Sequence, residues 1–295
     1  MKTAEDVKAE EDRSDAAEGP ETAPKAADAP EGGAATKAPE GEEGEETVGQ
    51  VGCPLLRFLN VQHTEIMGDM ETLKRLHELQ HVLCHFASIT GNIRVAQNWP
   101  NLEVLKMNGK TVLGNLSVFA ATPHLSVLVL TKTGVLGKIE DLGANALLTQ
   151  LDLYGTQVGG DLAELASQPH LQELYMSYCD VVGDVGNLAS NNAGLTRILL
   201  DYTYVLGNVA CFEGNELLVE IGLAYTQITG SLGCLHGCTA LEFLNLYGVR
   251  GLDSGAMESK EEKQMVKELK KALAGPTFCA KAAVEGRSKT CVVTI

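Results

Sequence analysis

The sequence lacks long apolar runs and clustered basic residues, and these two absences exclude whole classes of function. No stretch approaches the ~18 consecutive apolar residues of a membrane-spanning helix, and the first residues include no apolar segment like that of a secretory signal. Lysine and arginine number 23 against 39 acidic residues, and they form no stripe. Nucleic acids and anionic membranes bind clustered basic side chains, so we expect neither as a partner. The prediction is a soluble, intracellular protein of the cytoplasm.

Aromatic residues are also scarce, at 5% of the chain, and the eight cysteines do not fall into closely spaced pairs. In a reducing compartment such cysteines are expected to remain free thiols. The rest of the composition, 44% hydrophobic and 21% charged, is typical of a globular protein. A chain of 295 residues with this composition is long enough to bury a large continuous core.

Residues 1–50 differ in character from the rest of the chain. They contain 15 acidic and 5 basic residues among Ala, Pro and Gly, with almost no branched or aromatic side chains. Such a segment buries too little apolar surface to offset the entropy lost on ordering, which predicts a disordered acidic tail. Its role is either that of a solvating tail or that of a segment that docks on a basic partner.

From Leu56 to Val249 the chain repeats one unit of 23 residues nine times, with a single unit of 24 residues before Leu195. Counted within the unit, apolar residues occupy positions 1, 4, 6, 11, 15 and usually 18, glycine occupies position 13, and a small residue usually occupies position 9. The clearest copy consists of Leu148, Leu151, Leu153, Thr156, Val158, Gly160, Leu162 and Leu165. A fixed period of about 20–29 residues is the signature of a solenoid.

The pattern within the unit predicts how each coil is built. Positions 3 to 8 alternate between outward and inward side chains, so we expect strands that pair in one parallel sheet. The threonine hydroxyl that is common at position 9 can satisfy buried backbone groups. Glycine at position 13 indicates a backbone angle or a close approach that a side chain would prevent. The few remaining residues predict short 3₁₀ or irregular turns on the convex side.

The unit resembles the leucine-rich repeat, and it is most similar to the plant-type variety, in the pattern L-x-x-L-x-L-x-x-T-x-V-x-G-x-L-x-x-L. It departs from that type in having mostly Thr where Asn is usual at position 9, and in being one residue shorter. The resemblance implies an α/β solenoid over residues 51–252, a horseshoe or arc of about nine units. It also implies that a concave parallel sheet binds another protein, and it implies no catalysis.

The repeat pattern fails after Gly248, and residues 253–295 are expected to form a C-terminal cap. Ser259 and Glu262 are spaced as a capping box, which predicts a helix over about 260–274 that Gly275 and Pro276 end. An open solenoid end exposes core, so this helix is expected to cover the last unit, with an edge strand in the tail that follows. A partner-binding helix is the alternative.

The candidate binding site lies on the exposed positions of the predicted concave sheet, namely 3, 5, 7 and 8. Six of the seven tyrosines fall there, all in units five to nine: Tyr154, Tyr175, Tyr178, Tyr202, Tyr225 and Tyr247. Four acidic residues share this face and suggest a partner with Arg or Lys: Asp152, Glu173, Asp201 and Glu220. Tyrosine is enriched in binding hot spots, so we expect a protein or peptide ligand on a non-enzymatic scaffold or adaptor. Alternatively, the tyrosines shield the sheet and pack on each other.

A second function from another class is a metal site or an enzyme built on His63, His81 and His85. Histidine and cysteine are good zinc ligands, and Cys84 lies beside His85. The repeat register, however, puts Cys84 at core position 6 and points it away from His85 at position 7. We therefore expect no cofactor and no catalytic residues. Cys211 and Cys234 share position 17 in adjacent units, which is close enough in principle for a disulfide bond.

Overall fold

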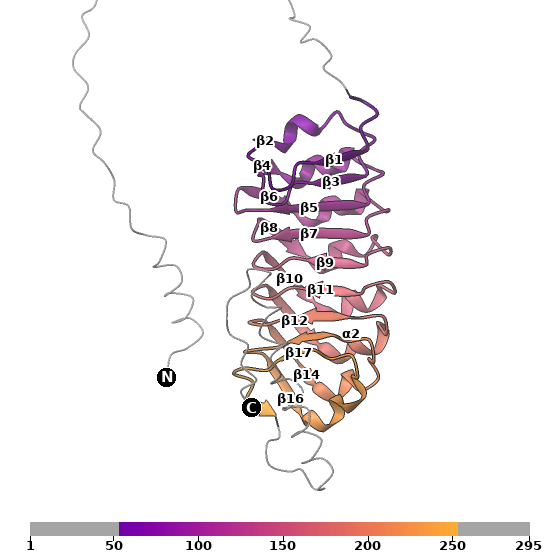
Figure 1. Ribbon diagram of the computed structural model, residues 1–295, viewed down its shortest axis with the longest axis vertical. Coiled ribbons are helices and arrows are strands. Elements are labelled where there is room, and N and C mark those ends of the chain that lie inside the picture. Colours follow the sequence, from indigo (N-terminus) through magenta and orange to yellow (C-terminus); the bar gives the residue numbers. More distant parts are fainter. Residues whose placement is uncertain (1–52, 253–295) are drawn as a thin grey trace, which may run out of the picture. The chain divides into compact units, whose positions relative to one another are not determined.

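The computed structural model describes residues 53–252, which form one stack of nine coils (Figure 1). Each coil contributes a strand to each of two parallel sheets, and each sheet contains nine strands. Strands follow one another in chain order across both sheets, and neither sheet closes on itself. The predicted leucine-rich repeat solenoid of about nine units is confirmed. The expected tail over 1–50, the helix over 260–274 and the edge strand after it lie outside the described residues.

The first sheet is the predicted one, formed by positions 3 to 5 of each unit. Its strands are β1 (Phe58–Asn60), β3 (His81–Leu83), β5 (Val104–Asn108), β7 (Val127–Thr131), β9 (Gln150–Asp152), β11 (Glu173–Tyr175), β13 (Arg197–Leu199), β15 (Glu220–Gly222) and β17 (Phe243–Asn245). Equal positions lie opposite each other, because Glu173 pairs with both Gln150 and Arg197. The strand register of the first sheet is therefore unchanged across the one 24-residue unit.

The second sheet was not expected, because the sequence analysis assigned no strand to positions 10 to 14. Its strands are β2 (Met67–Asp69), β4 (Ser88–Asn92), β6 (Val112–Asn115), β8 (Gly134–Lys138), β10 (Gln157–Asp161), β12 (Asp180–Asp184), β14 (Tyr204–Asn208), β16 (Gln227–Gly230) and β18 (Gly251–Leu252). Here position 12 of one unit pairs with position 10 of the next, as Gly159 does with Asp180. The glycine inside each strand hid its period-two pattern.

The glycine at position 13 has the role that the sequence predicted. Seven of these glycines have a positive φ between 105° and 134°: Gly91, Gly114, Gly137, Gly160, Gly183, Gly207 and Gly230. A Cβ built on Gly137 would lie 3.0 Å from the backbone nitrogen of Leu116 in the previous coil. Both the angle and the close contact exclude a side chain there.

Short helices form the convex return, as predicted. They are η1 (Met70–Leu73), η2 (Ile93–Asn98), η3 (Leu116–Ala121), η4 (Ile139–Leu142), η5 (Leu162–Ser167), η6 (Val209–Phe212) and η7 (Leu232–Gly237), all 3₁₀, and the α-helix α2 (Val185–Asn191). The α-helix occurs in the 24-residue unit, where the extra residue lengthens the turn. Most begin at an Asp, Asn or Ser whose side chain accepts a backbone N–H, as Asp161 does from Ala163.

Two polar columns run through the interior beside the apolar core. Thr156 at position 9 donates its hydroxyl hydrogen to the carbonyl of Leu153 at 2.8 Å, within its own unit. Position 21 forms a second column that the sequence analysis missed. There Asn145 donates to the carbonyls of Phe119 (3.0 Å) and Thr122 (2.8 Å) in the previous coil. These bonds join successive coils on the convex side and satisfy carbonyls that the helices leave open.

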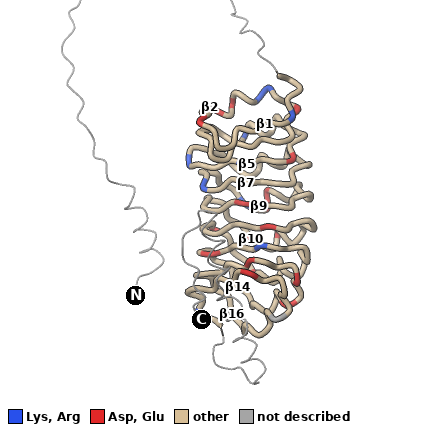
Figure 2. The backbone as a smooth tube through the Cα atoms, viewed as in Figure 1, with Lys and Arg blue, Asp and Glu red and all other residues tan. Residues whose placement is uncertain are grey.

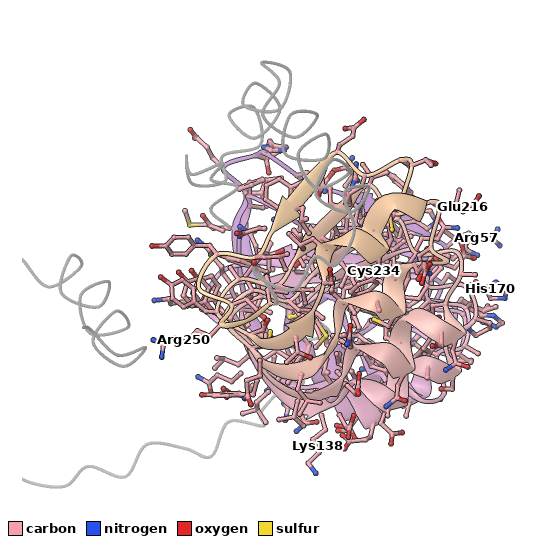
Figure 3. All side chains as sticks on the ribbon, turned by 90° about the horizontal axis from the view of Figure 1, so that it is seen from below. Arg57, Lys138, His170, Glu216, Cys234 and Arg250 are labelled. Carbon is pink, nitrogen blue, oxygen red and sulfur yellow. The ribbon has the colours of Figure 1, made fainter. Side chains whose placement is uncertain are left out.

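Seen along the stack, residues from distant coils lie on the same side when their positions in the unit are close. Arg57, His170 and Glu216, at positions 2, 23 and 22, all project from one side of the coils, and Arg250 at position 10 projects from the opposite side (Figure 3). The repeat period therefore fixes the direction of each side chain around the stack.

Candidate functional site

The turn after each strand of the first sheet has a backbone conformation that few residues adopt. Position 8 has a positive φ in every unit, from 54° to 105°. The residues there are His63, Phe86, Gly109, Lys132, Gly155, Tyr178, Tyr202, Tyr225 and Gly248. Glycine takes these angles freely, whereas a bulky side chain is strained by about 1–2 kcal/mol. Three successive units nevertheless place tyrosine at this position.

The tyrosines at this turn form a continuous row, here called the aromatic ridge: Tyr154, Tyr178, Tyr202, Tyr225 and Tyr247. The three central rings stack, with centroids 4.5 Å apart between Tyr178 and Tyr202 and 4.6 Å apart between Tyr202 and Tyr225. Tyr154 and Tyr247 meet the two ends edge-on, at 5.6 and 5.3 Å. Five predicted site residues are thus brought together in one row across five coils.

Stacking decides which parts of the rings can contact a ligand. Tyr202 has a ring stacked on each side, so its faces are covered and its edge and hydroxyl remain. Tyr178, Tyr225 and Tyr247 are 37%, 41% and 46% exposed. The pKa of Tyr225 is raised to about 12 by burial and by hydrogen bonding with Tyr247 and Tyr202. The ridge therefore presents a row of neutral hydroxyl groups and ring edges.

Asp201 holds the three central turns of the ridge together. Its carboxylate accepts from the backbone N–H of Ala224 at 2.8 Å and from the Ser177 hydroxyl at 3.2 Å. Ser177 and Ala224 directly precede Tyr178 and Tyr225, and Asp201 itself precedes Tyr202. Asp201 was expected to face a partner. The structure instead makes it a partly buried positioning residue that links residues 24 and 23 apart.

Burial raises the pKa of Asp201, although its hydrogen bonds to Ala224 and Ser177 act in the opposite direction. A folded-state pKa above the unfolded value means that folding favours the protonated carboxyl. This contribution to stability is present below the ordinary Asp pKa of about 4 and is lost as pH rises through the folded-state value.

We expect Asp201→Asn to gain stability relative to the wild type as pH rises from about 4 to about 7, because the amide keeps an acceptor for Ala224 without a buried charge. Urea unfolding of both proteins at several pH values measures the difference. A difference that stays constant across this range would contradict the assignment.

Tyr175 does not belong to the ridge, which corrects the expectation that it is exposed. Its side chain is only 6% exposed and donates to the carboxylate of Glu173 at 3.2 Å. Burial raises its pKa to about 12. Tyr175 lies between Asp152 and Leu199 on the first sheet and bonds to Glu173 of its own strand, so alternation along the strand did not guarantee exposure.

The acidic residues of the first sheet already have a basic partner within the chain. Arg197, which the sequence analysis missed, contacts Glu173 at 3.0 Å and Glu220 at 3.7 Å. All three residues occupy position 3 of successive units, so the repeat register itself carried the signal. The carboxylate of Asp152 accepts the Tyr154 N–H at 3.0 Å and the Thr131 hydroxyl at 3.1 Å. These contacts weaken the case for a basic partner that the acidic residues suggested.

The histidines of the first two units form an aromatic cluster. His63 and His85 both stack on Phe86, with centroids 4.8 and 4.3 Å away, and His81 lies 3.5 Å from Glu103. Burial lowers the pKa of His85, and Cys84 is buried in the core as the register predicted. Across residues 53–252, no three His, Cys, Asp or Glu side chains are grouped to hold a metal ion.

Six cysteines fall within the described residues, and all are free thiols. Cys211 and Cys234, at the same position of adjacent units, are partly buried. Burial raises their pKa values to about 12 and about 11. Both thiols are therefore protonated near neutral pH, which makes them poor nucleophiles.

Comparison with protein families and with curated proteins finds no match for this sequence. Solved structures do match. A leucine-rich repeat protein of Leptospira interrogans superposes with a TM-score of 0.56 at 17% identity, over 73% of this chain and 53% of that one. The leucine-rich repeat ectodomain of the Arabidopsis receptor kinase HAESA, in complex with an extended IDA peptide hormone, superposes with a TM-score of 0.57 at 22% identity. The match covers 64% of this chain and 34% of that one. A TDR receptor superposes with a TM-score of 0.53 at 16% identity, over 67% of this chain and 44% of that one.

This chain thus spans between about a third and a half of the length of those solved chains. At such identities the likeness shows the fold. Among the helices of the described coils, none is long and apolar enough to cross a membrane.

Proposed function

Because this chain has the leucine-rich repeat fold, we propose that it is a non-enzymatic scaffold that binds a protein or peptide along the aromatic ridge. The observation that carries the proposal is the left-handed backbone of Tyr178, Tyr202 and Tyr225. Every unit has this left-handed turn, but the fold does not require an aromatic side chain on it, and strain of this kind tends to occur at functional sites. The HAESA ectodomain, which shares the fold, is solved with a peptide hormone bound.

The fold does not require a side chain at these positions. Gly109, Gly155 and Gly248 occupy the same turn in other units with the same sign of φ. Three tyrosines in this conformation cost roughly 3–6 kcal/mol, while four ring contacts return roughly 2–6 kcal/mol. The two amounts are comparable, so mutual packing alone does not account for tyrosine there.

The shape of the ridge favours an extended ligand. Five coils at the ~4.8 Å strand spacing give a row about 20 Å long. Its hydroxyl groups can each donate and accept a hydrogen bond, and the amide and carbonyl groups of an extended peptide can pair with them. Since Glu173 and Glu220 already pair with Arg197, hydrogen bonding supports recognition more than charge does.

We expect the triple variant Tyr178→Gly, Tyr202→Gly, Tyr225→Gly to keep its stability and to lose its partner. Relief of the left-handed strain offsets the lost ring contacts, whereas removal of three tyrosines should weaken binding at least tenfold, or about 1.4 kcal/mol. Affinity capture with quantitative mass spectrometry, together with thermal unfolding, measures both effects.

Tyr204→Ala is the matched control, since Tyr204 is 57% exposed on the second sheet, outside the ridge. Partners captured equally by the wild type, the control and the triple variant would refute the proposal.

A further inference from the structure

The first coil leaves the core of the solenoid open at its end. Position 11 is an interior column, and Val112, Val135 and Val158 are each 0% exposed there. Ile66 holds the same position in the first unit and is 50% exposed. Leu56, Leu59 and Val61, at the core positions 1, 4 and 6, are likewise only partly buried.

At the other end of the described stack, positions 4 and 6 of the unit are more deeply buried. In β17 and the turn after it, Leu244 is 5% exposed and Leu246 is 8% exposed. The equivalent residues of the first unit, Leu59 and Val61, are more exposed than this. The end that carries β1 and β2 therefore leaves these core positions exposed.

The same end carries an edge strand whose backbone can pair again. The N–H of His81 bonds to the carbonyl of Arg57, and the N–H of Val61 bonds to the carbonyl of Leu83. Backbone groups alternate in direction along a strand, so those of Phe58 and Asn60 point away from β3. An edge strand of this kind is a template for pairing with another chain. Phe58, 54% exposed, adds apolar surface beside it.

The preceding segment of the chain is poorly suited to cover this end. Residues 1–50 contain no Leu, Ile, Phe, Tyr or Trp. A cover for a core face must itself be apolar. A second copy of the first coil supplies such a surface, together with an edge strand of the same sequence.

We propose that two copies of this chain associate through their first coils about a two-fold axis, with β1 of each copy paired antiparallel to β1 of the other. The exposed core faces of the two coils cover each other beside this pair. The interface lies on the end of the stack, away from the aromatic ridge, so the proposal is independent of the peptide-binding function.

The charge around this end is compatible with self-association. The first unit, residues 56–78, carries three basic and four acidic residues, whereas the whole chain carries −16. Both signs of charge surround this end of the stack (Figure 2). β1 has three residues and is therefore only ~10 Å long, so the strand pair alone is a small contact. A specific interface buries at least ~1,000 Å² in total, so the two coil faces must contact each other beside the strand pair.

The test is the mass of the full chain in solution as a function of concentration, by sedimentation or light scattering. We expect a concentration-dependent shift from 31.4 kDa towards twice that mass. Ile66→Asp places a charge in the apolar face and should shift the chain to monomer. Phe58→Pro removes an N–H that points away from β3, so it should abolish the dimer while β1 stays paired with β3.

Leu113→Asp is the matched control, because Leu113 is 51% exposed on the second sheet rather than at the end, and it should remain dimeric. Hydrogen exchange at the amides of Phe58 and Asn60 should slow as the wild-type concentration rises. A wild type that is monomeric at every concentration overturns the proposal and leaves a different protein, or another segment of this chain, as the occupant. A dimer that both end variants retain overturns it equally.

Discussion

Gly137→Val is expected to lower the free energy of unfolding by about 3–5 kcal/mol. The φ of Gly137 is +123°, an angle at which a β-branched residue is a strong outlier. A Cβ there would also lie 2.9 Å from Oδ1 of Asn115 and 3.0 Å from the backbone nitrogen of Leu116. Backbone strain of ~1–3 kcal/mol adds to a similar cost of overpacking. Urea unfolding followed by far-ultraviolet circular dichroism measures the loss.

Gly143→Ala is the control for this prediction. Gly143 has a φ of −57° at the end of η4, and a Cβ at this residue would lie 3.4 Å from the carbonyl oxygen of Glu140, an ordinary contact. Alanine fits that angle and reduces the entropy of the unfolded chain, so stability should be unchanged or slightly higher. An unfolding midpoint for Gly137→Val equal to that of the wild type would contradict the role assigned to position 13.

Trp99→Ala is expected to cost about 3–5 kcal/mol, the range found when a buried Trp is truncated. Trp99, the one tryptophan of the chain, is 0% exposed at position 21. Its indole N–H donates to the carbonyl of Leu73 in the previous coil at 3.3 Å. Truncation removes both the packing and the bond between coils. Because each coil contacts only its neighbours, the first two coils should open before the rest.

Trp99→Phe separates the two contributions. This variant retains most of the buried volume and removes only the N–H donor. Its free energy of unfolding should therefore fall by only about 1–2 kcal/mol. Hydrogen exchange should show faster opening of β1 and β3 in Trp99→Ala than of β9 and β11. Uniform destabilisation of all nine coils would contradict the expected nearest-neighbour behaviour.

The aromatic ridge shows how much of the candidate site could be predicted from the sequence. The period of 23 placed Tyr178, Tyr202 and Tyr225 at one position of successive units, and their stacking follows from that spacing. The left-handed φ of these residues was not predicted, since tyrosine rarely takes that angle and only Gly109, Gly155 and Gly248 at the same position hinted at it. A repeat makes such a hint visible, because one position must serve the same turn in every coil.

Contacts between coils were less predictable than contacts within them. Asp201, Arg197 and Tyr175 each fall at the position of the unit that the register assigns, yet Asp201 and Tyr175 were expected to be exposed and Arg197 was given no role. The surroundings of each of these residues depend on side chains from the units before and after. The length and charge of the side chains 23 or 24 residues away therefore decide whether a residue is buried and whether it forms an ion pair. Position 21 was missed because Trp99, Asn145 and Cys238 have no common chemistry in the sequence.

The sequence by itself determined the coil: its period, its core positions, the glycine that permits a positive φ, and the pairing of equal positions in the first sheet. These follow from local preference and from repetition, which one chain displays in full. Only the tertiary structure decided the second sheet with its two-residue shift, the burial of Tyr175, the link from Asp201 to two neighbouring turns, and the open face at Ile66. Each of these features depends on contacts between atoms of adjacent coils, and the sequence of a single unit does not determine those contacts.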